Sequence, residues 1–261
     1  VHPDGSVYTC CPTWINNYCI GNVFNKSFDR IWKSVNARIF RQQILEGDYS
    51  TCNRAICLSY KEIYDKNLTD CPPYPEYVKF WHDVECTYCC ITCRDKPLVV
   101  SKEVVDFLNS KIYDTFLPIL KNAKTVSFSG SGDPFASRHC RELIKAVVKE
   151  YPNIKIDLHT NGSLCNQKNW EELGILNRVS LVEMSIHATN SDTYKMITKN
   201  GKFDEVMENL RWVSDLKKAK KINDIIMTFV VHKYNYKEMP AFAELAFELG
   251  AIPSFSAYVD W

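Results

Sequence analysis

Residues 83–94 read DVECTYCCITCR and directly follow an apolar, strand-like run. Within them, Cys86, Cys90 and Cys93 form the spacing C-x3-C-x2-C. Three thiolates from one short loop can bind three irons of a four-iron cluster and leave the fourth iron without a protein ligand. An open coordination position of this kind binds a small molecule at other catalytic metal sites. The stretch therefore predicts a [4Fe–4S] cluster at the end of a strand.

The cysteine spacing leaves two other chemistries open. A zinc ion could use Cys86, Cys89, Cys90 and Cys93, although two adjoining C-x2-C pairs give the loop little slack to surround a tetrahedral ion. A redox-active C-x-x-C pair is the other alternative. Cys89 is surplus to a three-thiolate cluster site, and we expect it to be a packed thiol.

The segments after the cysteine loop alternate between strand-like and helix-like patterns, which favours a mainly parallel sheet built from βα units. Apolar residues at three- and four-residue spacing mark the helices. Six strands are expected at 78–85, 125–129, 154–159, 181–187, 225–232 and 252–259, and five helices at 101–121, 138–151, 167–175, 203–219 and 237–249. The pattern predicts an α/β fold, a partial (β/α)6 TIM-like barrel rather than a closed eight-stranded one.

The composition is that of a globular protein without a dominant charge. The 261 residues are 46% hydrophobic, which is enough to bury a sizeable core. Thirty-two basic and thirty-one acidic residues give a net charge of +1, so we expect no nucleic-acid partner. The apolar runs are shorter than the ~20 residues of a membrane span, and we expect no membrane association. No secretory leader is visible at Val1, and we expect the sequence to be a fragment.

The twelve cysteines are too many for packing alone. Disulfide frameworks are typical of small secreted domains that lack a large core. We therefore expect metal or cluster ligation in a reducing compartment, and a cytoplasmic location. Cys71, Cys140 and Cys165 are interpreted as buried thiols.

The C-x3-C-x2-C motif after a first strand resembles that of the radical S-adenosylmethionine (SAM) superfamily. In that superfamily the open iron chelates the amino and carboxylate groups of SAM. One electron from the cluster then releases a 5′-deoxyadenosyl radical, which abstracts hydrogen from a substrate. The chemistry belongs to the cofactors, while the protein supplies position and excludes water.

The resemblance extends to segments after the next three strands. Residues 129–135, SGSGDPF, are similar to the "GGE" segment that holds the methionine amino group, and residues 160–162 are similar to a Thr-Asn-Gly strand ending. The resemblance also implies that Ser185 contacts the ribose or the methionine carboxylate. The residues expected to bind the cofactor are Gly130, Ser131, Gly132, Asp133, Thr160, Asn161, Ser185 and Thr228.

Candidate acid–base residues come from the strand faces. Alternation with period two places Glu183, Ser185 and His187 on one face of the fourth strand. The expected catalytic residues are His187, Tyr258 and Asp260, and His159 is a further candidate for a substrate acid or base.

The first 77 residues form a separate module in this interpretation, and residues 78–261 form the barrel. A hairpin is expected around Asp4-Gly5, with Ser6 to Thr9 as its second strand, and one helix is expected from Ser27 to Gly47. The module resembles the SPASM/twitch auxiliary-cluster modules of radical enzymes, although it precedes the barrel. The positions that match are Gly5, Cys10, Ile20-Gly21-Asn22, Ile31-Trp32, Arg41 and Cys52.

The expected ligands of a second, auxiliary iron–sulfur cluster are Cys10, Cys11, Cys52 and Cys57, with Cys19 the least expected of the nearby thiols. A structural zinc ion in the same thiolates is the alternative.

The resemblance implies oxidation, epimerisation or cross-linking of a peptide, or of a sugar or other small metabolite. It also implies a one-electron donor such as flavodoxin or ferredoxin. Two other functions stay open: an activase that installs a glycyl radical on a protein partner, and a zinc-stabilised α/β binding protein without enzymatic activity. Fold alone cannot choose among substrates, because function depends on the site.

Overall fold

The computed structural model describes residues 1–55, 57, 73–128 and 130–258. Its largest element is a parallel sheet of six strands whose spatial order follows the chain order. The strands are β3 (Tyr77–Phe80), β4 (Thr125–Phe128), β5 (Lys155–Thr160), β6 (Val179–Ser185), β7 (Asp224–Val231) and β8 (Ile252–Ala257). The six predicted strands and the α/β partial barrel are confirmed. Because neighbouring strands are parallel, their carboxyl ends share one rim.

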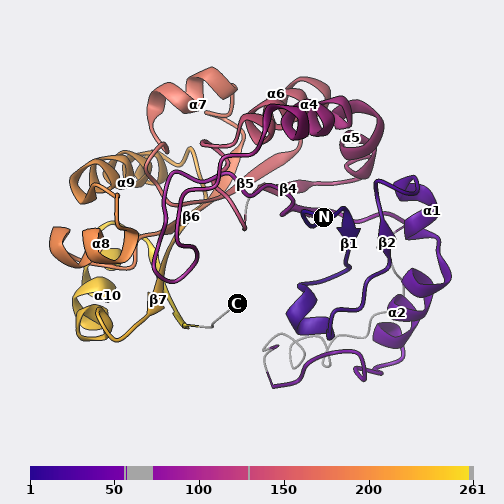
Figure 1. The fold of residues 1–261 in the computed structure, drawn as a ribbon, viewed down its shortest axis with the longest axis horizontal. Helices are drawn as coiled ribbons and strands as arrows, with labels where there is room; N and C mark the ends of the chain where they lie inside the picture. The colour runs from indigo at the N-terminus through magenta and orange to yellow at the C-terminus, as the bar shows by residue number, and fades with distance from the viewer. Residues whose placement is uncertain (56, 58–72, 129, 259–261) are drawn as a thin grey trace.

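Helices join the strands and lie along the outer side of the sheet (Figure 1). They are α4 (Lys102–Ser110), η2 (Ile112–Phe116), α5 (Leu117–Ile119), α6 (Arg138–Glu150), α7 (Gln167–Leu173), α8 (Ser191–Thr198), α9 (Phe203–Lys218), η3 (Tyr236–Glu238) and α10 (Met239–Glu248). The core lies between these helices and the strands, where Val126, Leu158 and Met184 are fully buried. Among the described residues, no helix is long and apolar enough to cross a membrane.

Two helix predictions in the barrel need correction. The expected helix at 101–121 is interrupted, because α4 is followed by the π-helical turn η2 and the short α5. Pro118 has no N–H to donate four residues back, so a regular α-helix cannot continue through it. Helix α8 was not predicted. It has eight residues and depends on its cap, in which the Asn190 side chain accepts from Thr193 N.

The amino-terminal hairpin is predicted correctly at its turn but not in its strands. Gly5 N donates to His2 O and His2 N donates to Ser6 O, both at 2.9 Å, and the Asp4 side chain accepts from Ser6 N and Oγ, so the chain does turn at Asp4-Gly5. The predicted second strand, Ser6 to Thr9, is wrong in its extent and partner: β1 is Ser6–Val7 and pairs antiparallel with β2 (Gly21–Asn22).

The predicted single helix from Ser27 to Gly47 is also wrong. It is divided into α1 (Phe28–Trp32) and α2 (Val35–Leu45). Ser34 separates them, because its backbone is extended and its hydroxyl caps α2 by accepting from Ala37 N. The turn η1 (Pro12–Ile15) follows the first cysteine pair.

Aromatic packing joins the module to the barrel. The Phe24 ring contacts the rings of Phe107 and Phe116, with centroids 5.5 and 6.3 Å away. The Tyr74 hydroxyl, just before β3, donates to the Asp29 carboxylate of α1. These contacts place the module beside the β3 edge of the barrel (Figure 1).

A buried histidine pair lies where β3 ends against α6. The Nε2 atoms of His82 and His139 are 2.8 Å apart, and Nδ1 of His139 is 2.8 Å from Oδ1 of Asn109. The His82 ring stacks on Phe116. Burial lowers the pKa of His139 to about 4 and that of His82 well below its ordinary value, so both imidazoles are neutral in the folded protein.

Acid is expected to destabilise the protein through this pair. The pKa of each histidine is lower in the folded protein than in the unfolded chain. As pH falls from about 6.5 to about 4, the unfolded chain therefore binds a proton on His139 that the folded protein does not bind. His139 alone accounts for a loss of about 3 kcal/mol in the free energy of unfolding. Denaturant unfolding across this pH range measures the loss, and His139→Gln should flatten it. Equal pH slopes in the two proteins would show that the pair is not responsible.

Candidate iron–sulfur and cofactor site

The three motif cysteines lie on a loop beyond the carboxyl end of β3. The strand ends at Phe80, earlier than predicted, and the chain then leaves the sheet. The N–H groups of Cys93 and Arg94 both donate to Cys90 O, at 2.9 and 3.0 Å, which forms a tight turn between two of the thiols. Burial, with Cys86 and Cys93 nearby, raises the pKa of Cys90 to about 12.

Nitrogen donors lie close to the sulfurs of Cys86 and Cys93. Asn161 Nδ2 and Tyr88 N lie 3.5 Å from Cys86 Sγ, and Arg94 Nε lies 3.3 Å from Cys93 Sγ. Hydrogen bonds to cysteine sulfurs stabilise thiolates and tune the potential of iron–sulfur clusters. At Cys86 these donors oppose the effect of burial, which raises the pKa of the thiol.

Cys89 faces away from this group. It is buried, and its thiol lies 3.6 Å from Asn200 Oδ1, while Asn200 Nδ2 donates to Thr87 O at 2.8 Å. The expectation of a packed thiol is confirmed. Within the described part of the chain, no group of three cysteine, histidine or carboxylate side chains is already arranged to hold a metal ion. The fit of a cluster therefore rests on the donor chemistry of the loop.

Arg94 ties the cysteine loop to the glycine-rich segment. Its Nη1 donates to Val84 O at 2.9 Å, and its Nη2 donates to Ser131 O. The sequence did not single out Arg94, and its position directly after Cys93 was the only available signal. The guanidinium binds backbone carbonyls on both sides of the loop, and its Nε donates to Cys93 Sγ.

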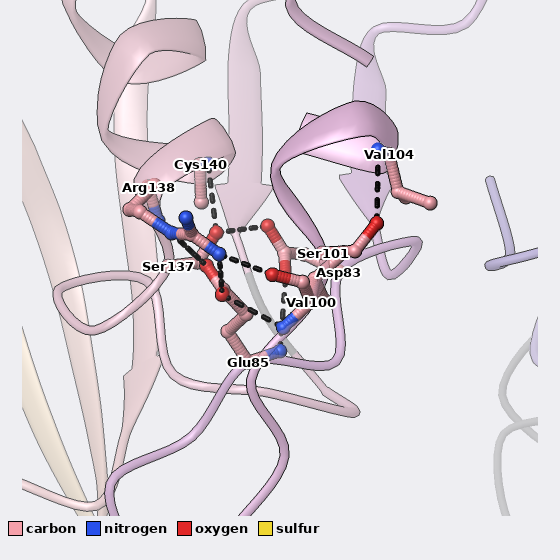
Figure 2. A network of polar contacts seen from close by, with 8 residues as sticks. All are labelled: Asp83, Glu85, Val100, Ser101, Val104, Ser137, Arg138 and Cys140. Carbon is pink, nitrogen blue, oxygen red and sulfur yellow. Dashed lines mark hydrogen bonds and ion pairs between the residues drawn. The ribbon is translucent and has the colours of Figure 1, made fainter. Parts of the chain in front are cut away.

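Glu85 anchors the start of the loop to two helices (Figure 2). Its carboxylate accepts from Val100 N at 2.9 Å, just before α4, and from Arg138 N at 3.0 Å, at the first residue of α6. Arg138 Nη2 adds an ion pair at 2.7 Å. Burial opposes ionisation of Glu85, but the Arg138 guanidinium and the two backbone N–H groups lower its pKa below its ordinary value.

A second carboxylate reinforces the same junction. Ser137 Oγ donates to Asp83 and accepts from Cys140 N at 2.9 Å, which caps α6 (Figure 2). The sequence analysis missed Glu85, although an acidic residue in a run predicted to be a buried strand was a usable signal.

The glycine-rich segment packs directly on the loop backbone. A Cβ on Gly132 would lie 2.5 Å from Glu85 O, and one on Gly130 would lie 1.8 Å from Trp81 Nε1. Asp133 N donates to Glu85 O at 2.7 Å. Only glycine permits this close approach, so Gly132 lies directly against the loop backbone and Gly130 against the Trp81 side chain.

Asp133 is the buried centre of the segment. One carboxylate oxygen accepts from Thr160 Oγ1 at 2.6 Å and Asn161 N at 2.9 Å, and the other accepts from Phe135 N and Ala136 N. Asp133 and Thr160 therefore position Asn161, whose amide contacts Cys86. Their expected contacts with a cofactor stay predictions.

The inner strand face carries a line of polar side chains. Thr228 Oγ1 donates to Ser185 Oγ at 3.1 Å, and Ser185 Oγ lies 3.2 Å from His159 Nε2. Glu183 and Ser185 are half-buried and alternate with the fully buried Val182 and Met184, as the period-two pattern predicted.

The three expected catalytic residues lie in different settings. Strand β6 ends at Ser185, so His187 does not continue its face; it is buried at φ 60°, with Nδ1 accepting from Val230 N at 3.1 Å. Tyr258 is half-exposed and lines a hollow of about 520 Å³ with His232 and Tyr236. Asp260, like Cys71, lies outside the described residues. Their catalytic roles stay predictions.

The predicted ligands of the amino-terminal module lie on two segments of the chain that are joined by a hydrogen bond. Burial raises the pKa of Cys10, and Cys57, Cys11 and Cys52 raise it further. Asn53 N donates to Trp14 O at 2.7 Å and joins the two cysteine segments. The Cys19 thiol donates to Gly21 O at 3.2 Å.

Comparison with protein families agrees with this geometry. The radical SAM superfamily matches residues 83–246, and SPASM, an iron–sulfur cluster-binding domain, matches residues 1–58. The chain belongs to the radical SAM superfamily. The expected order of an amino-terminal SPASM domain followed by a radical SAM core is confirmed.

Individual relatives are distant. A probable GTP 3′,8-cyclase of Saccharolobus islandicus is 27% identical over 168 residues, which cover 64% of this chain and 50% of the relative. The structure of Streptococcus suis SuiB bound to S-adenosylmethionine covers 87% of this chain and 53% of that protein, with 14% identity and a TM-score of 0.50. The structure of anSMEcpe with bound AdoMet covers 70% and 51%, with 20% identity and a TM-score of 0.46. The chain spans about half the length of these relatives.

The radical SAM core should depend on Glu85 for its stability. Glu85→Ala leaves the N–H groups of Val100 and Arg138 without their acceptor, and we expect a loss of about 2 kcal/mol in the free energy of unfolding. Denaturant unfolding of the anaerobically purified protein measures the loss.

Glu172→Ala is the matched control, because Glu172 pairs with Arg141 but is 47% exposed at its side chain. Exposed ion pairs contribute little, so this variant should lose less than about 1 kcal/mol. A similar loss in both variants would contradict the anchoring role of Glu85.

Proposed function

We propose that this chain provides the catalytic core of an enzyme that cleaves SAM reductively and uses the 5′-deoxyadenosyl radical to abstract hydrogen from a substrate. The observation that carries the proposal is the Cys86–Cys93 loop at the carboxyl rim of the barrel, held by Glu85 and Arg94, with N–H donors directed at its sulfurs. When bound, the cluster supplies the electron for this cleavage.

In this proposal, residues of the chain bind the cluster, bind SAM and position both groups. Cys86, Cys90 and Cys93 hold the cluster, and the backbone of Gly130, Ser131 and Gly132 forms the floor against which SAM binds. Asp133 and Thr160 position Asn161 beside Cys86. Ser185 and Thr228 contact SAM from the inner strand face. Together these groups orient the cofactor and exclude water from the radical.

Cys10, Cys11, Cys52 and Cys57 hold an auxiliary iron–sulfur cluster in this proposal. The SPASM match to residues 1–58 and the hydrogen bond from Asn53 N to Trp14 O, which joins the two cysteine segments, support it. In this proposal the module ends near residue 77, where β3 begins. Every cysteine that the structure describes is unpaired, as in proteins of a reducing compartment. We place the enzyme in the cytoplasm, with an electron donor such as flavodoxin or ferredoxin.

The proposed substrate is a peptide, or a sugar or other small metabolite. Among the structural neighbours, SuiB has been crystallised with the precursor peptide SuiA, and BtrN with AdoMet and 2-DOIA.

Anaerobic reconstitution tests the core of the proposal. With dithionite and SAM, the wild-type protein should form 5′-deoxyadenosine, and Cys86→Ala/Cys90→Ala/Cys93→Ala should form none above background, because the cluster ligands are gone. The triple variant should keep the iron and sulfide of the auxiliary site. A wild-type protein that binds zinc alone and never cleaves SAM would falsify the proposal.

The auxiliary ligands are tested separately. Cys10→Ala/Cys57→Ala should lose the remaining iron and sulfide while still forming 5′-deoxyadenosine, since its radical SAM loop is intact. Cys19→Ala is the matched control and should keep its full iron content. Loss of iron in the control, or zinc in the module, would contradict the proposed ligand set.

A further inference from the structure

The cysteine loop also contacts α8 and the residues that connect α8 to α9 (Figure 1). Ile91 N donates to Ile197 O at 2.9 Å, and Asn200 Nδ2 donates to Thr87 O at 2.8 Å. On the side of the loop, both contacts are made by backbone groups. They therefore fix the course of the chain between Thr87 and Ile91 and not only the position of one side chain.

Two buried tyrosines add a contact between the same segments. The Tyr194 hydroxyl of α8 donates to the Tyr88 hydroxyl at 3.3 Å, and the two rings pack edge to face with their centroids 6.3 Å apart. Tyr194 is fully buried, and Tyr88 is buried as well. Helix α8 therefore supports the loop at the residue next to Thr87.

The connection between α8 and α9 is tightly constrained. Lys199 has φ 63°, in the left-handed region that a non-glycine residue keeps only where its surroundings hold it there. Thr198 Oγ1 accepts from Gly201 N at 3.0 Å, and a Cβ on Gly201 would lie 2.4 Å from that oxygen. The residues on both sides of Asn200 are therefore fixed in conformation.

The two contacts of Asn200 determine which way its amide points. Thr87 O can only accept a hydrogen bond, so the NH2 group of Asn200 faces it. The amide oxygen, Oδ1, then faces the Cys89 thiol, which donates to it at 3.6 Å. Asn200 therefore binds the loop backbone and the surplus thiol at the same time.

The sulfur of Cys89 differs in its hydrogen bonding from the sulfurs of two expected ligands. Cys86 Sγ and Cys93 Sγ each accept from a side-chain nitrogen, whereas Cys89 Sγ donates to an oxygen. Iron binds cysteine as a thiolate, which accepts hydrogen bonds and has no hydrogen to donate. The contact with Asn200 thus suits a thiol that is not a cluster ligand.

A choice between thiols is necessary because the loop contains two adjacent cysteines. With Cys90 as the middle ligand the spacing is C-x3-C-x2-C, and with Cys89 in its place the spacing is C-x2-C-x3-C. Both spacings put three thiols on one short loop. Spacing along the chain therefore leaves the second set open, whereas the contact with Asn200 holds Cys89 away from it.

We propose that Asn200 is a positioning residue that holds the cysteine loop in the conformation in which Cys90, and not Cys89, binds the cluster. The proposal rests on the proposed radical SAM function and adds to it a residue that selects the ligand set. Asn200 acts through Thr87 O and the Cys89 thiol and not by contact with the cofactor.

The first test measures access to the Cys89 thiol and needs no SAM. Iodoacetamide is added anaerobically to the reconstituted protein, and modification of each cysteine is followed by peptide mass spectrometry. Asn200→Ala should raise the rate of Cys89 modification about tenfold, because hydrogen bonds to Thr87 and Cys89 are lost. The buried Cys140 of α6 should keep its wild-type rate. Asn200 is exposed and fills no core, so we expect the variant to fold.

Asn223→Ala is the matched control. Asn223 bonds Ser180 at the amino end of β7, whereas the cysteine loop lies beyond the carboxyl end of β3, so this variant should leave the Cys89 rate unchanged. A Cys89 rate that Asn200→Ala does not change overturns the proposal. An equal rise at Cys140 also overturns it, because the opening is then global and not confined to the loop.

The second test asks which thiol binds the cluster. The readout is the iron and sulfide bound in excess of the Cys86→Ala/Cys90→Ala/Cys93→Ala variant, which lacks the loop cluster. Cys90→Ala should lose this excess, because Asn200 keeps Cys89 from replacing Cys90. Cys90→Ala/Asn200→Ala should regain most of it, and a further Cys89→Ser should remove it again.

A merely structural role of Asn200 cannot restore a cluster, so a Cys90→Ala/Asn200→Ala variant without excess iron overturns the proposal. So does a Cys90→Ala variant that keeps its full excess, because Cys89 is then not held apart. A wild-type protein without excess iron contradicts the proposed radical SAM function itself, and this result is distinct from both of the others.

Discussion

The buried carboxylate of Glu85 is the constraint on which the site depends. It lies one residue before the first motif cysteine and accepts from backbone N–H groups where α4 and α6 begin. An anion is favourable at this position because the starts of helices carry unpaired N–H groups and a partial positive charge. The cysteine loop therefore leaves β3 in one direction, although it lies outside the sheet and has no strand partner.

The same loop is fixed from its other side by polar groups that approach from β4 and β5. Arg94 spans from Val84 to Ser131, and Asp133 binds the end of β5 through Thr160 and Asn161. The result is a network of hydrogen bonds that joins the cysteine loop, the glycine-rich segment and the end of β5. Such networks are costly to break singly, because each lost partner leaves a buried group without a hydrogen bond.

The two faces of β6 separate polar side chains from the apolar core. Glu183 and Ser185 are half-buried on the inner strand face, and Ser185 Oγ lies 3.2 Å from His159 Nε2. The residues between them, such as Val182 and Met184, fill the core beneath the helices. The sheet therefore keeps polar groups on one face and the apolar contacts that stabilise it on the other.

Much of the architecture could be predicted from local pattern. Period-two strands alternating with amphipathic helices specify a parallel sheet, and three cysteines on one short loop specify cluster chemistry, because both depend on residues close together in the chain. Helix breaks were harder to predict. The predicted helix at 101–121 is interrupted near Pro118, and the predicted helix from Ser27 to Gly47 is divided at Ser34. Each break depends on the backbone of one residue, which the spacing of apolar residues does not reveal.

The sequence by itself determined the fold class and the presence of a cysteine-rich module, and it predicted the three thiols that hold the cluster. Only the tertiary structure decided that Asp133 holds Asn161, that Cys89 faces Asn200, and that His159 lies between Ser185 and Glu183. These roles depend on which residues of separate strands become neighbours and on which polar groups are buried together. Spacing along the chain reports ligands that share a loop, whereas partners contributed by different strands are specified by the sheet register and by packing.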